Sequence, residues 1–316
     1  MNEKLARPIN LQVDNSGLLK RKIQHLRILA VTTAVATYAL IVLGSTVRVT
    51  NSGMGCPSWP LCAGHVGPIY EFHPLLEQSH RYLASVVTIL IISVAILVWR
   101  LGSSVYHMRG AIKLGLAMIV VQIILGAITV LAHNAPPTVA IHLFVALFFL
   151  AIVTVIAFLS FIAPDQEWSL RRYPTKLMWS SVVGLFLVFI SGSLVVNGGA
   201  SRACPSWPLC SSKAPMPLVV LQLLHRSLVL IATILVVTAF ISLLVRTQSS
   251  NGMKVVLVLG LVMLMAQIIL GAIDAMSSAP AVLADLHLVF AAGIWVIEIV
   301  SLSFSARKNI PAIGQL

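Results

Sequence analysis

The stretch GSTVRVTNSGMGCPSWPLC at residues 44–62 returns as GSLVVNGGASRACPSWPLC at residues 192–210. The heptad CPSWPLC is identical in the two copies, and a histidine followed by an arginine comes shortly after each copy, at residues 80–81 and 225–226. Further on, the heptapeptide QIILGAI occurs twice, and one more histidine follows each occurrence. The chain is therefore a duplicated unit, and each copy carries two cysteines and two histidines in the same order.

The composition places this duplicated unit in a membrane. Of the 316 residues, 59% are hydrophobic and only 9% are charged, a balance that does not suit a soluble domain. Apolar runs of 18 or more residues are typical of helices that span a bilayer, at about 20 residues each. The sequence contains eight such runs, at residues 27–49, 77–99, 111–132, 138–162, 176–197, 218–245, 254–276 and 280–305.

The repeat divides the chain near residue 163. We expect an all-α integral membrane protein whose eight transmembrane helices form two tandem, pseudo-symmetric four-helix bundles. Because each half has an even number of crossings, both halves have the same orientation. The first 26 residues are polar and basic, without the pattern of a signal peptide. The expected segments are a cytoplasmic N-terminal segment, the first half, a cytoplasmic linker, the second half and a cytoplasmic tail, at residues 1–26, 27–163, 164–175, 176–305 and 306–316.

The net charge is +12, and the uneven distribution of the lysines and arginines along the chain indicates the topology in the membrane. If the N-terminus is inside, 16 of the lysines and arginines fall on the inner side and five on the outer side. Such an excess predicts cytoplasmic termini in a multi-pass protein of the cell membrane, with the outer loops in an oxidising compartment. It also favours contact with membrane lipid over binding of nucleic acid. The five outer cations are Arg48, Arg81, Arg202, Lys213 and Arg226.

Four histidines occupy matching places in the two halves. His80 and His142 are expected about one turn into the second and fourth spans, and His225 and His287 take the same places in the second half. Because the second and fourth spans run in the same direction, each half brings two imidazoles to one depth near the outer face. Two such imidazoles can ligate one heme iron from its two sides. A buried core histidine is the alternative, but ionisable groups inside a membrane are costly and usually functional.

The two copies differ beside one of these histidines. Glu77 lies three residues before His80, on the same helical face, whereas the second copy has Gln222 at the corresponding position. One half therefore carries an acid–base group beside its expected heme site, although an acid favoured by the start of a helix is the alternative. Asp274 and Asp285 occur only in the second half, where Asp285 is a propionate-side or structural residue. The sequence assigns no role to the deeply placed Glu298.

Other polar side chains near these sites have two interpretations each. Arg81 and Arg226 directly follow histidines, so each can pair with a heme propionate or extend to water at the membrane interface. Arg48 has a similar but less supported place. The glutamines that begin the two QIILGAI segments can bond neighbouring helices or contact a cofactor directly; they are Gln122 and Gln267.

The four cysteines fall in the two outer loops. The prolines of CPSWPLC turn each loop back on itself, which makes Cys56–Cys62 and Cys204–Cys210 plausible disulfides. A structural staple over the pocket is the favoured role of these pairs. The alternatives are redox activity and a metal site with His65 and His73, which have no counterparts in the second copy.

These features together resemble a known family. The chain is similar to heme A synthase in three motifs. They are VRVTNSGMGCPSWPLCAG at residues 47–64, EQSHR at residues 77–81 and the three later histidines. The resemblance covers about residues 27 to 305 of the chain. Members of that family oxidise the C8 methyl of heme O to a formyl group, which gives heme A for terminal oxidases.

The resemblance implies a role for each half. It implies that His80 and His142, with Arg81, hold the substrate heme O and its product heme A, and that Glu77 is the catalytic carboxylate. It also implies that His225 and His287, with Arg226, hold a heme b that relays electrons. The implied partners are heme O, delivered by heme O synthase, and an electron acceptor that the sequence does not identify. The sequence leaves the oligomeric state open, a homo-oligomer included.

Two other classes of function remain open from the residues alone. A bis-histidine diheme cytochrome b would use the four histidines but gives no reason for Glu77 to differ from Gln222. A thiol-disulfide oxidoreductase would use the cysteine pairs but gives the histidines no role.

Overall fold

The computed structural model describes residues 12–163, 166, 168–170, 175–211, 213–246, 251–277 and 280–307. Parts of the predicted N-terminal segment, linker and tail lie outside the described residues. Within this described part the chain is all helical, without a β-strand, as the sequence predicts. The helices are α1 (Gln12–Val49), α2 (Phe72–Leu101), the 3-10 helix η1 (Gly102–Met108), α3 (Arg109–Leu131), α4 (Pro136–Leu159), α5 (Lys176–Asn197), α6 (Met216–Arg246), α7 (Asn251–Met276) and α8 (Ala281–Ser305).

Seven helical segments in the described ranges are long and apolar enough to cross a membrane. One of them, Phe72–Leu131, is 60 residues long and contains α2, η1 and α3. A straight helix of that length would extend far beyond a hydrocarbon core of about 30 Å. The chain instead reverses at η1, where Gly102 has a φ of 60° and Val105 is non-helical, so that α2 and α3 pack against each other.

Most of the helices begin earlier than the apolar runs that predicted them, whereas α5 and α8 begin within one residue of the expected positions. Helix α1 starts at Gln12, inside the region expected as a separate N-terminal segment, and Leu26 is already fully buried. Helix α2 starts at Phe72 and therefore includes Glu77 in its second turn. The difference arises because the ends of a membrane helix are polar, so hydropathy alone places its boundaries too far inward.

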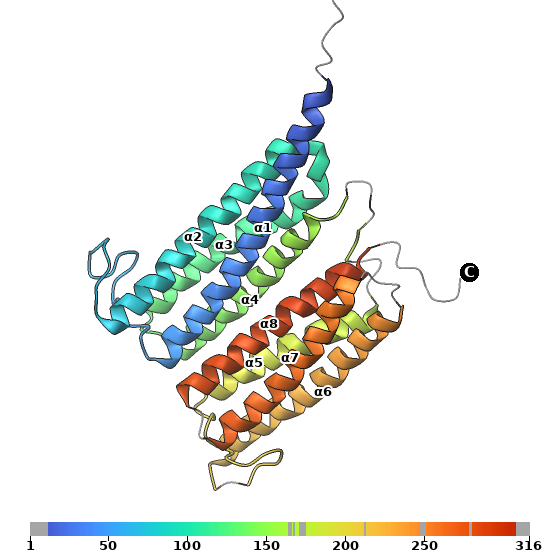
Figure 1. The fold of residues 1–316 in the computed structure, drawn as a ribbon. Helices are drawn as coiled ribbons and strands as arrows, with labels where there is room; N and C mark the ends of the chain where they lie inside the picture. Colours follow the sequence, from blue (N-terminus) through green and yellow to red (C-terminus); the bar gives the residue numbers. More distant parts are fainter. Residues whose placement is uncertain are drawn as a thin grey trace, which may run out of the picture.

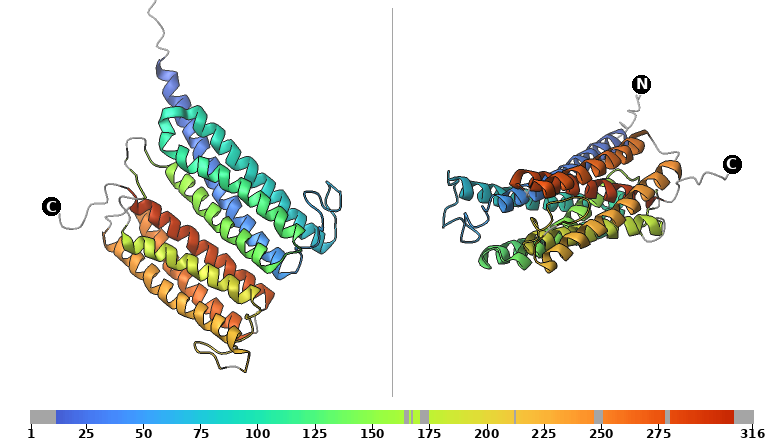
Figure 2. Two further views of the ribbon diagram at one scale, coloured as in Figure 1. Left: turned by 180° about the vertical axis from the view of Figure 1, so that it is seen from behind. Right: turned by 90° about the horizontal axis from the view of Figure 1, so that it is seen from below.

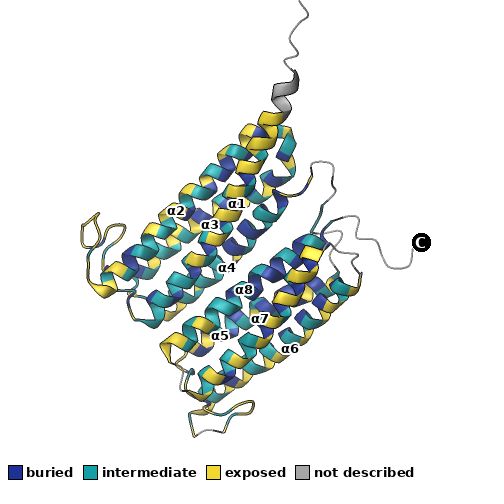
Figure 3. Cartoon of the chain, in the orientation of Figure 1, coloured by how far each residue is buried: buried dark blue, intermediate teal, exposed yellow. Residues whose placement is uncertain are grey.

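The eight α-helices of the described residues lie in two groups, α1–α4 and α5–α8, which Figures 1 and 2 show side by side. The groups meet where α4 and α1 pack against α8 and where α4 packs against α5. Hydrogen bonds across this boundary include one from Tyr38 to the carbonyl of Val289 at 2.9 Å and one from Trp295 to the carbonyl of Leu147 at 3.0 Å. Buried side chains line the inside of both groups, while exposed residues line the outer surfaces (Figure 3).

The two disulfide-bearing loops lie at the same end of the molecule (Figure 1). The first joins α1 to α2 and the second joins α5 to α6. The described start of α1 and the end of α8 lie at the opposite end (Figure 1). The four repeat-related histidines are all in the helical turns nearest the loop end, so this end holds the candidate site.

Candidate functional site

Each repeat-related histidine faces a glycine on the helix that precedes its own. The imidazole of His80 on α2 lies over Gly44 of α1, and His287 on α8 lies over Gly271 of α7. A Cβ added at these two glycines would stand only 2.9 and 2.8 Å from the imidazole Cε1 atoms. The same arrangement recurs at the other two histidines. These pairs are His142 with Gly126 and His225 with Gly192.

The histidines also pair within each half. His80 and His142 lie close enough to interact electrostatically, and so do His225 and His287. All four rings are more than half buried in apolar helix bundles. Each half thus brings two imidazoles, one from its second and one from its fourth helix, within electrostatic range of each other.

The ring nitrogens of these histidines are incompletely satisfied. Among the described residues, the buried Nδ1 atoms of His80, His142 and His287 have no hydrogen-bond partner. Only His225 has one, because its Nδ1 lies 2.8 Å from the Ser191 hydroxyl. Buried polar atoms without partners are rare and costly, so a set of three at repeated positions indicates a ligand. Paired imidazoles inside an apolar bundle fit the axial ligation of a heme.

Two glutamines contact the other ring nitrogen of the fourth-helix histidines. The side-chain nitrogen of Gln122 lies 3.3 Å from His142 Nε2 and donates to the backbone carbonyl of His142 at 3.0 Å. Gln267 Nε2 lies 3.2 Å from His287 Nε2. Each glutamine therefore bonds a histidine of the neighbouring helix, which is one of the two interpretations that the sequence left open.

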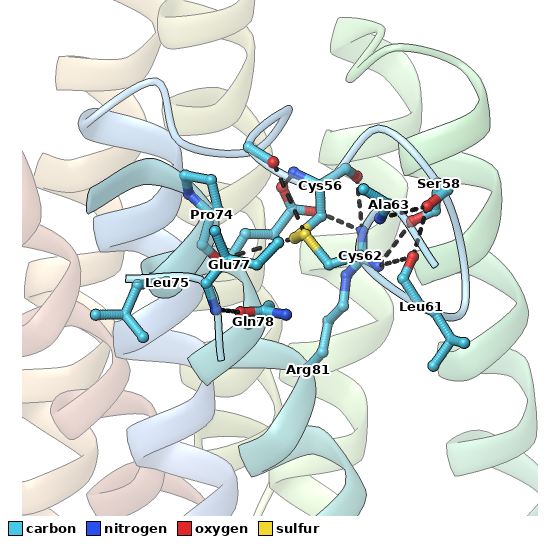
Figure 4. Close-up of a disulfide and its surroundings, with 12 residues drawn as sticks. Cys56, Ser58, Leu61, Cys62, Ala63, Pro74, Leu75, Glu77, Gln78 and Arg81 are labelled. Carbon is cyan, nitrogen blue, oxygen red and sulfur yellow. Dashed lines mark hydrogen bonds and ion pairs between the residues drawn. A yellow bond between two sulfur atoms is a disulfide. The ribbon is translucent and has the colours of Figure 1, made fainter. Parts of the chain in front are cut away.

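Glu77 is a buried carboxylate held beneath the first disulfide loop. Its side chain is 4% exposed. Oε2 accepts a hydrogen bond from the backbone N–H of Cys56 at 2.8 Å, and Oε1 lies 2.6 Å from the Arg81 guanidinium (Figure 4). Glu77 lies about one helical turn before His80 on α2, and Arg81, which holds the carboxylate, directly follows that histidine.

The residue at the corresponding place in the second half has the opposite hydrogen-bonding polarity. Gln222 is 6% exposed, and its amide nitrogen donates to the backbone carbonyl of Ala200 at 2.9 Å. Glu77 accepts hydrogen bonds from its loop, whereas Gln222 donates to its own. The difference between the two copies is therefore built into the loop backbone as well as into the side chain.

Arg81 and Arg226 hold the two loops in the same way. The Arg81 guanidinium donates to the carbonyls of Cys56 at 2.9 Å and Ser58 at 2.7 Å. Arg226 donates to the carbonyls of Cys204 at 3.0 Å and Ser206 at 2.8 Å. Neither interpretation from the sequence, a propionate partner or a side chain reaching to water, described this anchoring of the loop by its arginine.

Both predicted disulfides are present. Cys56 is bonded to Cys62, and Cys204 to Cys210, with Cα–Cα distances of 4.7 and 5.0 Å. Both loops also share a hydrogen bond, which the serine hydroxyl donates to the leucine carbonyl three residues later, from Ser58 to Leu61 and from Ser206 to Leu209. His73 Nδ1 lies 2.8 Å from the Ser52 hydroxyl. The thiols are therefore committed to disulfides, which argues against the metal site that the sequence left open.

Comparison with known proteins gives the family. The sequence profile of the COX15-CtaA family, described as cytochrome oxidase assembly protein, matches residues 27–73 and 70–299. The chain belongs to the COX15-CtaA family. The resemblance stated from the motifs is thereby confirmed.

Several curated relatives of the chain are named heme A synthase. A protein from Geobacillus thermodenitrificans named heme A synthase is 28% identical over 79% of this chain and 82% of its own length. Heme A synthases from Bacillus cereus and Bacillus anthracis are also 28% identical, over 90% of this chain and 94% of their own length. The similarity therefore covers both halves of the repeat.

Within this COX15-CtaA chain, some site residues escaped the sequence argument. Gly44 and Gly192, which face the second-helix histidines, carried no signal apart from their place in the repeated GS dipeptide. Ser191, the partner of His225, has Leu43 as its counterpart in the first copy. A search for small residues at matching places on the preceding helices would have found the glycines, but not the serine.

The glycine contacts predict a graded response to one added methyl group. In Gly271→Ala, the new Cβ would stand 2.8 Å from His287 Cε1, so we expect the imidazole to shift and the second-half heme to bind more weakly. Alanine favours a helix by about 1 kcal/mol over glycine, so helix propensity alone predicts the reverse. The measurement is heme per protein by absorbance after purification.

The matched control is Gly126→Ala, at the same place in the first half. Its Cβ would stand 3.4 Å from His142 Cε1, an ordinary van der Waals distance. We expect this variant to keep its heme content. Equal losses in the two variants would show that the contact with His287 does not position that ring.

Proposed function

We propose that the chain is a heme A synthase that oxidises the C8 methyl of heme O to a formyl group. Its family membership and its curated relatives make it an oxidoreductase of heme A biosynthesis. We further propose that the substrate heme O lies between His80 and His142 in the first half, and that a heme b lies between His225 and His287 in the second. The electrostatic proximity of the two histidines in each half supports this proposal, together with the buried Nδ1 atoms of His80, His142 and His287 that lack hydrogen-bond partners.

The observation that carries the proposal is the buried carboxylate of Glu77, one helical turn from His80 in the first half. The second half has Gln222 at the corresponding position and therefore lacks this carboxylate. Oxidation of a methyl group to an aldehyde removes four electrons and passes through an alcohol and a hydrated aldehyde. Each stage releases protons, which a carboxylate near the heme edge can accept. Gln222 cannot accept them, so the second half is suited to holding a cofactor rather than to transforming a substrate.

The chain's own residues set up this proton acceptor. Arg81 contacts Glu77 Oε1, and the Cys56 N–H fixes Oε2, so the carboxylate is oriented by both its helix and its loop. Because Arg81 also binds carbonyls of the loop, the disulfide loop and the carboxylate are held as one unit. The bound heme b would supply one-electron relay. As part of this proposal, Arg81 and Arg226 would each also interact by charge with a propionate of the heme in its own half.

The membrane arrangement is also part of the proposal. We propose that the eight α-helices cross the cell membrane as two tandem four-helix bundles, with both termini cytoplasmic and the heme sites near the outer face. The basic excess on the inner side and the seven apolar segments support it. Heme O would come from heme O synthase, electrons would pass to an acceptor of unidentified chemistry, and copies of the chain would associate in the membrane.

The decisive test is the identity of the heme that the protein produces. We expect that a host without its own heme A, expressing this chain with a heme O source, accumulates a heme with a formyl group on extraction and chromatography. Heme O and heme b alone would contradict the proposal.

A second candidate function is a bis-histidine diheme cytochrome b, which the repeated histidine pairs favour. It predicts two permanently bound hemes with similar spectra and no formyl heme in the same experiment. A thiol-disulfide oxidoreductase has less support, because the loop arginines bind the backbone of both disulfide loops.

A further inference from the structure

A charged bridge crosses the boundary between the two halves at the end that holds the candidate sites. The Thr46 hydroxyl on α1 lies 2.8 Å from Asp285 Oδ2 on α8 and donates to it. Arg48, one half-turn beyond Thr46, lies within electrostatic range of the same carboxylate. Within the described residues, Asp285 and Arg48 form no direct ion pair, so neither charge is neutralised by close contact with the other.

The bridge touches both histidine pairs through the chain. Asp285 lies two residues before His287, and Thr46 lies two residues after Gly44, which contacts His80. A separation of two residues on a helix turns a side chain to a different face. The Asp285 carboxylate therefore points across the boundary toward α1 while its neighbour His287 points into the second bundle.

The bridge residues have no polar counterparts at the matching positions of the repeat. Pairing Gly44 with Gly192 and His142 with His287 places Leu194 opposite Thr46, Val196 opposite Arg48 and Ala140 opposite Asp285. The pseudo-equivalent contact is thus apolar. The charges are not needed to join the halves, because the same repeat packs there without them.

The carboxylate is also incompletely satisfied. Within the described residues, Asp285 Oδ1 is buried and has no hydrogen-bond partner. A charge at membrane depth with unmet hydrogen bonds is costly, and such groups are usually retained for function. The function available to a fixed charge close to a metal ligand is electrostatic.

We propose that Asp285 and Arg48 set the reduction potential of the heme held by His225 and His287, and that Thr46 fixes the carboxylate in place. The inference rests on the proposed function, because it requires a heme in the second half. A negative charge stabilises ferric over ferrous iron and lowers the potential, while a positive charge raises it. The two side chains therefore act in opposite directions, and their balance determines how readily this heme takes an electron from the first half.

The test is a spectroelectrochemical titration of the purified protein, expressed without a heme O source and measured at one fixed pH. Asp285→Asn removes a negative charge, so the midpoint potential should shift to more positive values. Arg48→Gln removes a positive charge, so the midpoint should shift to more negative values. The double variant should return toward the wild-type value.

Charge-preserving variants separate electrostatics from packing. Asp285→Glu and Thr46→Val keep both charges, so each should stay closer to the wild-type midpoint than Asp285→Asn does. The low-spin absorbance of the heme reports in every variant whether both axial ligands remain.

Shifts of the same sign in Asp285→Asn and Arg48→Gln, or no shift in either, would overturn the inference. If Asp285→Asn fails to retain heme, the sign of the shift in Arg48→Gln still decides. A wild-type protein without second-half heme would refute the proposed function itself, which distinguishes that failure from a failure of the charge bridge.

Discussion

Replacement of Glu77 by glutamine is expected to abolish formyl-heme production while the protein still folds and binds heme. Loss of a positioned acid–base group typically lowers a rate by about 10²–10⁴-fold. Glutamine keeps the size of the side chain, and its amide oxygen can still accept the N–H of Cys56, which Glu77 Oε2 accepts at 2.8 Å. The measurement is the ratio of heme A to heme O extracted from cells that express each variant at equal protein level.

The control for Glu77→Gln comes from the other copy of the repeat. Gln222→Glu introduces a carboxylate at the corresponding place, next to the Ala200 carbonyl that Gln222 now binds. We expect this variant to keep producing heme A, with at most a loss of second-half heme, because our proposal places the reaction in the first half. Full heme A production by Glu77→Gln would remove the catalytic assignment.

Replacement of His225 by alanine is expected to remove the heme of the second half. His225 is one of the two imidazoles of that half, and its Nδ1 is bonded to the Ser191 hydroxyl. An iron that loses one of two axial ligands in an apolar bundle is left without a replacement from neighbouring apolar side chains. The measurement is the low-spin ferric signal in electron paramagnetic resonance, together with heme per protein.

The variant Ser191→Ala tests the same site with a milder expected loss of heme than His225→Ala. The serine orients the ring and does not ligate, and loss of such a partner typically weakens binding about 10–100-fold. We expect Ser191→Ala to retain heme at high concentration and to lose it on dilution. An unchanged low-spin signal in His225→Ala would show that this histidine is not a ligand.

The sequence predicted the features that depend on periodicity and repetition. Apolar runs predicted an all-helical membrane protein, and the repeated CPSWPLC predicted both disulfides. The matching places of the four histidines predicted two pairs. In the structure His80 lies within electrostatic range of His142, and His225 of His287, while their ligation of heme stays a prediction. These are local or symmetry-based signals, which one chain carries in full.

The sequence could not predict contacts that depend on how helices rotate against each other. The position of Gly44 over His80 and the bond from Thr46 to Asp285 both depend on the rotation of α1. The engagement of Arg81 with loop carbonyls depends on the turn of a loop whose path hydropathy does not encode. Helix boundaries failed for a related reason, because polar ends such as that of α1 continue the helix beyond the apolar run.

The account depends most on the claim that each half places two imidazoles on one heme. The most direct measurement is a structure of the heme-loaded protein in a lipid environment, determined by electron cryomicroscopy. We predict an iron between the ring nitrogens of His225 and His287, and a second heme between His80 and His142 when heme O is supplied. A heme ligated by histidines from different halves, or located away from all four, would contradict it.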